Sequence, residues 1–566
     1  EDEESLKDTA DKVSTIYDSY SDSEKNNYNY LWILYCLAKQ QGDEKSLKET
    51  VEKASVVYGK YADERVTNNY LSILYYLARQ QGDEQSLRET VEKVSAVHNN
   101  HVASEENSNV YLLILRYLAS KQEDEQSLKE TADKASNIYN GHSDSEGIAH
   151  SYLEILFILA SKQEDEQSLK ETAIKASAVY DNHPDSEKNA DNYLWILFYL
   201  AQQQGDEQSV KETVDKASTI YDEHAYSKKV ANSYIAILAC LVTKQEDEES
   251  LKDIAEKGST VYANHSDLKE IVNKYSFILF YLASKQEDEE SLKDIAEKGS
   301  TVYANHSSLE GIADKYSSIL FYLALKQEDE ESLKDTADKV STIYDSHPES
   351  EKIADDYIFI CRLLLSRQED ENTLRDIVDK AAAVYGNHTG SERIANNYFW
   401  ILYYLAKQQE DEKSLKETVD KASTVYKKKW KEKWRLAPIY ISILECLALK
   451  QEKVEDLNDT VDVANNIYKK PDYNRADYDK ELFVEIIDIT YLKILSYLVL
   501  KQEDEEKLKD IKSDADDIYN RYSTIVEVIR FFSKILVSMI RVENNMETLN
   551  EHLGELEKLL EPPLEG

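Results

Sequence analysis

The sequence predicts an all-α solenoid of about thirteen stacked helix hairpins. Segment 244–266 returns almost letter for letter at 285–307, and an apolar anchor recurs every 40 or 41 residues along most of the chain. Glycine and proline are scarce, with 13 and 6 copies in 566 residues. Repeats of this length build arrays whose cores lie between neighbours, and few breakers suit long helices joined by short turns. The anchors are Leu6, Leu47, Leu87, Leu128, Leu169, Val210, Leu251, Leu292, Leu333, Leu374, Leu415, Leu457 and Leu508.

Each repeat is interpreted as two helices, as residues 186–221 illustrate. An unbroken apolar run, Tyr193–Ala201, predicts a first helix that is covered on most sides. Gly205 and Asp206 then end that helix. An apolar stripe at i, i+4, i+7 and i+11 predicts an amphipathic second helix. The stripe consists of Val210, Val214, Ala217 and Tyr221.

The second helix carries start and stop signals in most copies. It is expected to begin at a capping box and to end at Asn-His turns such as the one at 182–184. The capping boxes are Ser46-x-x-Glu49, Ser86-x-x-Glu89, Ser127-x-x-Glu130 and Ser168-x-x-Glu171.

A loose motif recurs across nearly the whole chain. It reads Tyr193…Leu197…Gly205-Asp206…Ala217, with the alanine eleven residues past the aspartate. It returns at Tyr30…Leu34…Gly42-Asp43…Ala54, and again at Tyr398…Leu402…Glu410-Asp411…Ala422. In these residues the chain resembles the tetratricopeptide repeat family. The period also lies in the range of HEAT repeats, but Gly-Asp between the helices and alanine in the second helix fit the tetratricopeptide pattern better. The resemblance implies a right-handed superhelix whose concave face, lined by the first helices, binds proteins or peptides.

Two positions of the first helix vary freely between copies, while their neighbours scarcely change. The first position holds Trp, Ser, Leu, Glu, Ala, Phe or Lys; the second, three residues on, holds Tyr, Arg, Phe, Ala, Glu or Ser. Four residues before the first position lies a row of Asn, Asp and His, on the same helical stripe. Aromatic rings beside hydrogen-bonding groups are typical of binding surfaces. The candidate partner-binding residues are Trp32, Tyr35, Tyr75, Arg116, Glu154, Trp195, Asn232, Asn273, Phe277, Phe359, Arg362, Trp400 and Tyr403. The alternative is that these rings pack one repeat against the next.

The composition limits the classes of function. A formal charge of −42 disfavours general nucleic-acid binding, and no apolar run is long enough to span a membrane. The four cysteines lie in apolar helices and are interpreted as core residues, which weakly favours a cytoplasmic protein. One histidine per repeat is interpreted as a turn residue and the acidic blocks as solvated edges, so no metal or cofactor is expected. No nucleophile–base set is present, and an enzyme is not expected.

The C-terminal third departs from the regular pattern. A basic segment at 427–435 surrounds two tryptophans, and it is expected either to bind an acidic partner or to pair with the acidic edge of its own solenoid. Its candidate binding residues are Lys428, Trp430 and Trp434. The predicted organisation is a lone second helix at 1–20, a regular array at 21–425, a basic connection at 426–441, divergent repeats at 442–545 with an insertion near 469–485, and a capping helix and tail at 546–566.

Two functions fit these features. The first is a scaffold that binds a protein or peptide, used as the sensor or recognition arm of a larger protein. The second is a structural spacer or self-assembling repeat protein, which would not need divergent aromatic positions. Because residues 1–20 form a second helix without its first, we expect further repeats or another domain before them.

Overall fold

The computed structural model describes residues 3–19, 24–100, 104–309, 311–367, 371–428, 433–469, 478–542 and 546–560. These residues form 27 α-helices and no strand, so the predicted all-α solenoid is confirmed and the chain is a helical repeat protein. The helices are α1 Glu3–Ser19, α2 Glu24–Gln40, α3 Glu44–Lys60, α4 Glu64–Gln80, α5 Glu84–Asn100, α6 Glu105–Lys121, α7 Glu125–Gly141, α8 Glu146–Ala160, α9 Glu166–Asn182, α10 Glu187–Gln203, α11 Glu207–Glu223, α12 Lys228–Leu241, α13 Glu248–His265, α14 Lys269–Lys285, α15 Glu289–His306, α16 Ile312–Lys326, α17 Glu330–Ser346, α18 Glu351–Leu365, α19 Glu371–Asn387, α20 Glu392–Gln408, α21 Glu412–Tyr426, α22 Lys433–Lys450, α23 Val454–Tyr468, α24 Tyr478–Val499, α25 Glu505–Tyr522, α26 Val526–Val542 and α27 Met546–Leu560.

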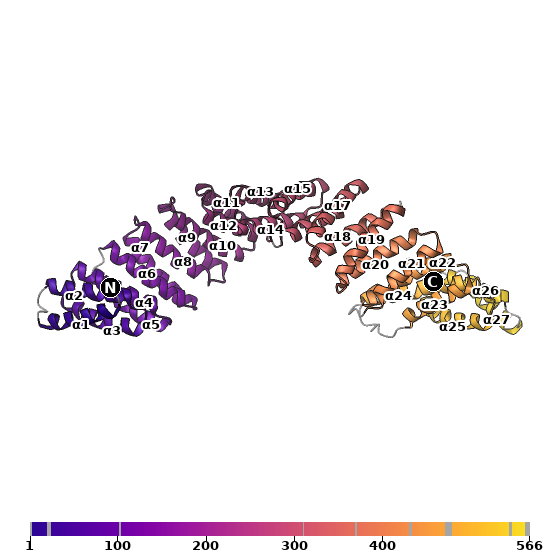
Figure 1. Cartoon of the computed structure of the whole chain (residues 1–566), viewed down its shortest axis with the longest axis horizontal. Coiled ribbons are helices and arrows are strands. Elements are labelled where there is room, and N and C mark those ends of the chain that lie inside the picture. Colours follow the sequence, from indigo (N-terminus) through magenta and orange to yellow (C-terminus); the bar gives the residue numbers. More distant parts are fainter. Residues whose placement is uncertain are drawn as a thin grey trace. The chain divides into compact units, whose positions relative to one another are not determined.

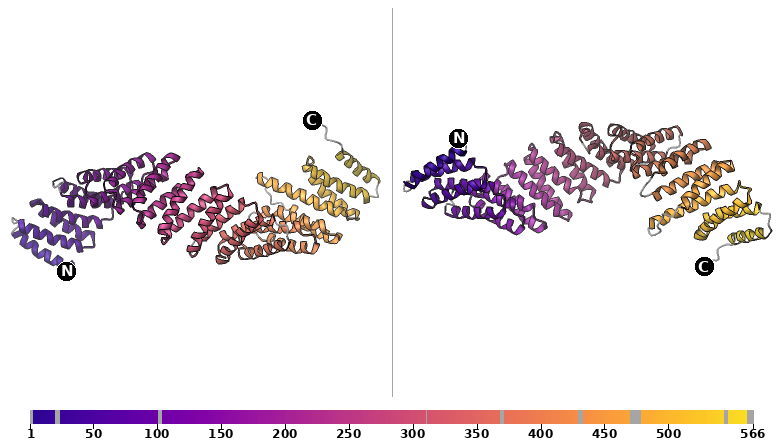
Figure 2. Two further views of the ribbon diagram at one scale, coloured as in Figure 1. Left: turned by 90° about the horizontal axis from the view of Figure 1, so that it is seen from above. Right: turned by 60° about the horizontal axis from the view of Figure 1, so that its bottom comes forward.

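The helices group into two compact units, Glu1–Lys285 and Gln286–Gly566. In each unit the even-numbered helices are the first helices of the repeats, and each packs against the even-numbered helices next to it (Figure 1). The odd-numbered helices lie between successive even-numbered ones and contact both. Figure 2 shows these helix pairs stacked side by side within each unit.

The core follows the predicted apolar pattern. In α10 the side chains of Tyr193, Leu197 and Ala201 are buried. In α11 the predicted stripe from Val210 to Tyr221 is buried as well. The even-numbered helices are therefore covered on most sides, whereas the odd-numbered helices expose their charged face to solvent.

Within each unit, an odd-numbered helix that lies between two even-numbered helices packs more extensively on the one after it than on the one before it. In most repeats a tyrosine in its last turns contacts the ring of a tyrosine on that next helix, as in two stacked pairs. The ring centroids of Tyr221 and Tyr234 lie 4.9 Å apart, and those of Tyr262 and Tyr275 lie 5.0 Å apart. The stack therefore joins one repeat to the next, where offset ring pairs add to the burial of apolar surface.

The turn between the two helices of a repeat is held by two hydrogen bonds that recur along the chain. An aspartate caps the odd-numbered helix, and in α3 the carboxylate of Asp43 accepts from the backbone N–H of Ser46 at 2.8 Å. The predicted capping boxes at Ser46, Ser86, Ser127 and Ser168 are therefore wrong, because each helix begins before the serine and the aspartate three residues earlier supplies the cap. A buried glutamine before the aspartate also accepts from a threonine of the odd-numbered helix, as in the 2.9 Å bond from Thr50 Oγ1 to Gln41 Oε1. The same 2.9 Å bond occurs in the repeats of Thr90, Thr131, Thr172, Thr213, Thr418 and Thr460.

The histidines lie where the sequence predicts, at the C-terminal ends of odd-numbered helices. Their rings reach back to the preceding repeat. His183 Nε2 lies 2.7 Å from the carbonyl oxygen of Ser143, and His224 Nε2 lies 2.7 Å from that of Pro184. Among the described residues no group of three or more side chains is arranged to hold a metal ion. Through their contacts with backbone carbonyl oxygens, these histidines link successive turns.

The C-terminal repeats depart from the regular geometry. Residues 433–441, predicted as part of the basic connection, belong to α22, which contains Pro438. Residues 470–477 of the predicted insertion lie outside the described residues, and residues 478–485 belong to α24. Helix α24, with 22 residues, also lengthens this repeat. Of the helices that the structure describes, none combines the length and the apolar run needed to cross a bilayer.

Candidate protein-binding surface

The two variable positions of the even-numbered helices form one surface in each unit, which we call the A face. Most of its side chains are partly exposed, and Trp32 is the most open of its rings, at 47% exposure. The surface is not uniformly open, because Ala236, Ser318 and Ser496 are buried at the same positions. Every predicted A-face ring, namely Trp32, Tyr35, Tyr75, Trp195, Phe277, Phe359, Trp400 and Tyr403, remains partly accessible.

The rings pack against one another while each keeps some exposed surface. Within α10 the centroids of Trp195 and Phe198 lie 5.3 Å apart, and between α16 and α18 those of Phe321 and Phe359 lie 4.9 Å apart. The second variable position of one even-numbered helix thus contacts the first position of the next. The rings therefore join neighbouring repeats and also remain accessible at the surface. The binding of a partner by these rings stays a prediction.

The polar row beside the A face forms hydrogen bonds between repeats. Ser233 donates to Asp191 at 2.5 Å, and Lys274 Nζ donates to Asn232 Oδ1 at 3.1 Å. Asn273 is partly exposed on α14. These predicted polar residues therefore lie at the edge of the rings, where several of them already join adjacent helices.

Two charged residues of the A face lie near an opposite charge on the next repeat. Arg116 Nη1 on α6 donates to Glu154 Oε2 on α8 at 2.5 Å, and each side chain is about one quarter exposed, at 29% and 26%. Burial acts to lower the pKa of Arg116, but the hydrogen bond and charge of Glu154 outweigh it and raise that pKa. Glu445 on α22 shows the opposite arrangement, since burial raises the pKa of its carboxyl and Lys493 on α24 acts against the rise.

Arg362 on α18 has no such partner. Its guanidinium lies between two rings of the A face, with Cζ 5.0 Å from the centroid of Phe359 and 5.5 Å from that of Trp400. Nη1 donates to Asn397 Oδ1 at 3.0 Å, and burial lowers the pKa of Arg362. Among the residues that the structure describes, it has no ion pair.

Two buried carboxylates lie on the same helix as Arg362. Asp355 pairs with Arg393 at 2.5 Å and accepts from Asn397 at 3.2 Å. Asp356 pairs with Lys352 at 2.5 Å and accepts two serine hydroxyls at 3.0 Å. Burial raises the pKa of both carboxyls. Asp356 is not among the predicted site residues, although an aspartate at a position where other repeats carry Asn, Ser, Lys or Val is a visible signal.

Of the predicted basic site, only Lys428 has a described side chain. Its Nζ lies 4.9 Å from the ring centroid of Tyr385 on α19, so this ammonium contacts its own solenoid. Trp430 lies outside the described residues, as does the side chain of Trp434.

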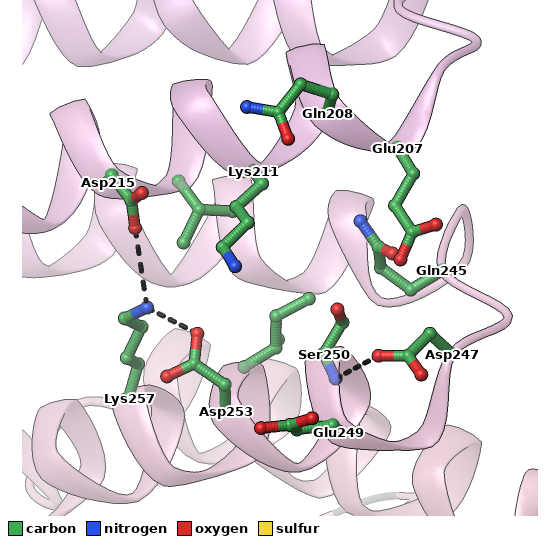
Figure 3. Close-up of a pocket in the computed structure, with 12 residues that line it drawn as sticks. Glu207, Gln208, Lys211, Asp215, Gln245, Asp247, Glu249, Ser250, Asp253 and Lys257 are labelled. Atoms are coloured by element: carbon green, nitrogen blue, oxygen red, sulfur yellow. Dashed lines mark hydrogen bonds and ion pairs between the residues drawn. The ribbon is translucent and has the colours of Figure 1, made fainter.

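Two hollows lie between odd-numbered helices, away from the A face. One, of about 680 Å³, lies between α11 and α13 and is lined mainly by charged side chains such as Glu207, Lys211 and Asp253 (Figure 3). At its edge Lys257 joins Asp215 and Asp253, and Asp247 caps α13. The other, of about 480 Å³, lies between α9 and α11 beside Ile174, which is 69% exposed. Neither contains a predicted site residue.

Comparison with known proteins adds little about function. No protein-family model and no curated protein matches the chain. One similar solved structure is described as showing that a conserved phosphorylation switch controls the interaction between cadherin and beta-catenin in vitro and in vivo. The match covers 91% of this chain and 98% of that chain at 13% identity, with a TM-score of 0.45, and carries no argument about function.

Proposed function

We propose that this chain is a non-catalytic, tetratricopeptide-like scaffold that binds a protein or peptide on its A face, as the recognition arm of a larger protein. One observation carries the proposal: two repeats with an identical odd-numbered helix differ on the A face. The helices α13 and α15 have identical sequences. The even-numbered helices that follow them differ on the A face, with Phe277 partly exposed in α14 and Ser318 buried in α16.

Physical chemistry favours this surface over the others. Partly exposed tryptophan and tyrosine rings supply large contact areas at small entropic cost. The hollow between α11 and α13 is lined largely by charged side chains instead. The identity of α13 and α15 also fits a spacer, which would bind nothing on its A face.

The test starts from a random peptide library displayed on phage and selected on the full chain. An enriched peptide is synthesised, and its affinity is measured for the triple variant Trp32→Ala, Trp195→Ala, Trp400→Ala. We expect a loss of roughly 30-fold or more, since truncating a binding hot spot costs ~2 kcal/mol.

The control replaces exposed apolar residues off the A face, Ile174→Ala with Tyr226→Ala, and should retain affinity. Urea unfolding separates binding from packing, because a core ring would cost roughly 3–5 kcal/mol of stability. Equal losses of affinity in both variants, or no enriched peptide, would contradict the proposal.

A further inference from the structure

The guanidinium of Arg362 departs from a rule that the other charged A-face residues obey. The second variable position of one even-numbered helix faces the first position of the next, as Phe321 and Phe359 show at 4.9 Å. When the second position is charged, the facing residue carries the opposite charge in two cases. Arg116 faces Glu154, and Glu445 lies near Lys493. Arg362 instead faces Trp400.

The nearby carboxylates do not compensate for this charge. Asp355 is occupied by Arg393 and by the side-chain amide of Asn397. Asp356 is occupied by Lys352 and two serine hydroxyls. Only Asn397 Oδ1 accepts a hydrogen bond from Arg362 within the described part of the chain. A guanidinium has five N–H donors, so most of its donors remain for another group.

We propose that Arg362 binds a side-chain carboxylate of the partner, held at the gap between Phe359 and Trp400; this rests on the proposed function above. The planar fork of arginine matches the two oxygens of a carboxylate, and the flanking rings exclude water, which strengthens the pair. Glu154 shows how such a carboxylate meets the equivalent Arg116, at 2.5 Å. The partner's acidic residue takes the place that Glu154 holds within the chain.

The charge of the chain constrains the rest of the partner. With a formal charge of −42, the scaffold repels a strongly acidic segment or a phosphate, which carries about −1.5 to −2. Trp400 and Phe359 favour apolar residues beside the carboxylate. The expected ligand is therefore one Asp or Glu in an apolar, otherwise neutral or basic peptide.

The experiment is a double-mutant cycle between the chain and the peptide enriched by the phage selection. The peptide is prepared with its acidic residue, with the matching amide (Gln or Asn), and with an amidated C-terminus. Each is titrated against the wild-type chain and Arg362→Gln. We expect the amide peptide and Arg362→Gln each to weaken binding about tenfold, and the combination to be no weaker than either, because both remove the same charge-assisted pair.

The control is Arg88→Gln, which removes one positive charge from the exposed odd-numbered helix α5 and should leave the preference for the acidic peptide intact. If Arg362→Gln unfolds, Arg362→Lys keeps the charge without the fork and should show an intermediate loss. A preference that survives the change at Arg362, peptides enriched without an acidic residue, or dependence on the C-terminal carboxylate alone would each overturn this inference while leaving the proposed function standing. A library that enriches nothing on the wild-type chain would overturn the proposed function first.

Discussion

Arg116 on α6 and Arg362 on α18 occupy the same position of their repeats, yet their surroundings differ. Arg116 is paired with Glu154 across the repeat boundary, whereas Arg362 is stacked between Phe359 and Trp400 without a counter-charge. The residue that faces the arginine from the next repeat differs between the two regions: it is Glu154 opposite Arg116 and Trp400 opposite Arg362.

The largest expected difference between the two regions is in stability. Arg116→Met should lower the free energy of unfolding by about 1–2 kcal/mol, because it leaves the partly buried Glu154 without its counter-charge. Arg362→Met should change it by less than ~0.5 kcal/mol, since removing an unpaired desolvated cation offsets the lost ring contacts. Urea unfolding of both variants measures the difference. Equal losses would show that the two arginines are equally well compensated.

A carboxylate placed opposite Arg362 should give it the internal ion pair that Arg116 has. Trp400→Glu should be more stable than Trp400→Ala by about 1 kcal/mol, because the new carboxylate occupies the position that Glu154 holds opposite Arg116. The advantage should shrink at high salt and disappear when Arg362→Met is added. An advantage that persists without Arg362 would point to helix propensity instead.

The stability of the two regions should change in opposite directions as the pH falls. In the region of α6 the change comes from a histidine on the neighbouring helix. His98 is buried, its Nε2 lies 3.1 Å from Ser108 Oγ, and His142 Nε2 lies 2.9 Å from the same hydroxyl. Burial and the charge of His142 lower the pKa of His98 from 6.5. The unfolded chain therefore binds the proton more readily, and this site loses stability as the pH falls below 6.5.

His98→Tyr, the residue found at this position in most repeats, should remove that loss. We expect the variant and the wild type to differ least above pH 6.5 and increasingly below it. Urea unfolding across this range checks the slope. A constant difference at all pH values would mean that His98 has the same pKa in the folded and the unfolded chain, which contradicts the assigned direction.

The smallest effect is expected at Asp356 on α18. Burial raises the pKa of its carboxyl above 3.8, although Lys352 and two serine hydroxyls favour its charged form. The folded state then holds the proton more tightly, so this group contributes more stability as the pH falls toward 3.8. Asp356→Asn should flatten that gain relative to wild type. A steeper gain in the variant would contradict the assigned direction.

The sequence predicts the repeats, both helices and the varying positions because those signals are local to one copy. It cannot predict which side chains meet across a boundary. The bond between Arg116 and Glu154 joins residues 38 apart, and it depends on how one repeat is rotated against the next. The sequence also cannot predict that Arg362 lacks an ion pair among the described residues. That feature depends on Trp400 of the next repeat lying opposite the guanidinium.

The sequence analysis also did not predict two local hydrogen bonds, the aspartate cap of the odd-numbered helix and the bond between threonine and glutamine. Ser46 has the composition of a helix cap, but Asp43 lies three residues earlier and takes the N–H. The bond between Thr50 and Gln41 could have been predicted, because both residues recur at a fixed spacing in most repeats. Neither residue belongs to the apolar pattern from which the helices are predicted, so that pattern does not predict their hydrogen bond.

The packing of each odd-numbered helix on the helix that follows has a consequence for protein engineering. The robust building block is an odd–even pair that starts at the aspartate cap, such as residues 165–205 with α9 and α10. Its two helices share the extensive interface and the ring contact of Tyr180 with Tyr193. Arrays lengthened in such blocks would keep each interface whole, whereas a cut at the histidine turn would divide one. New A-face sequences could then be introduced one block at a time.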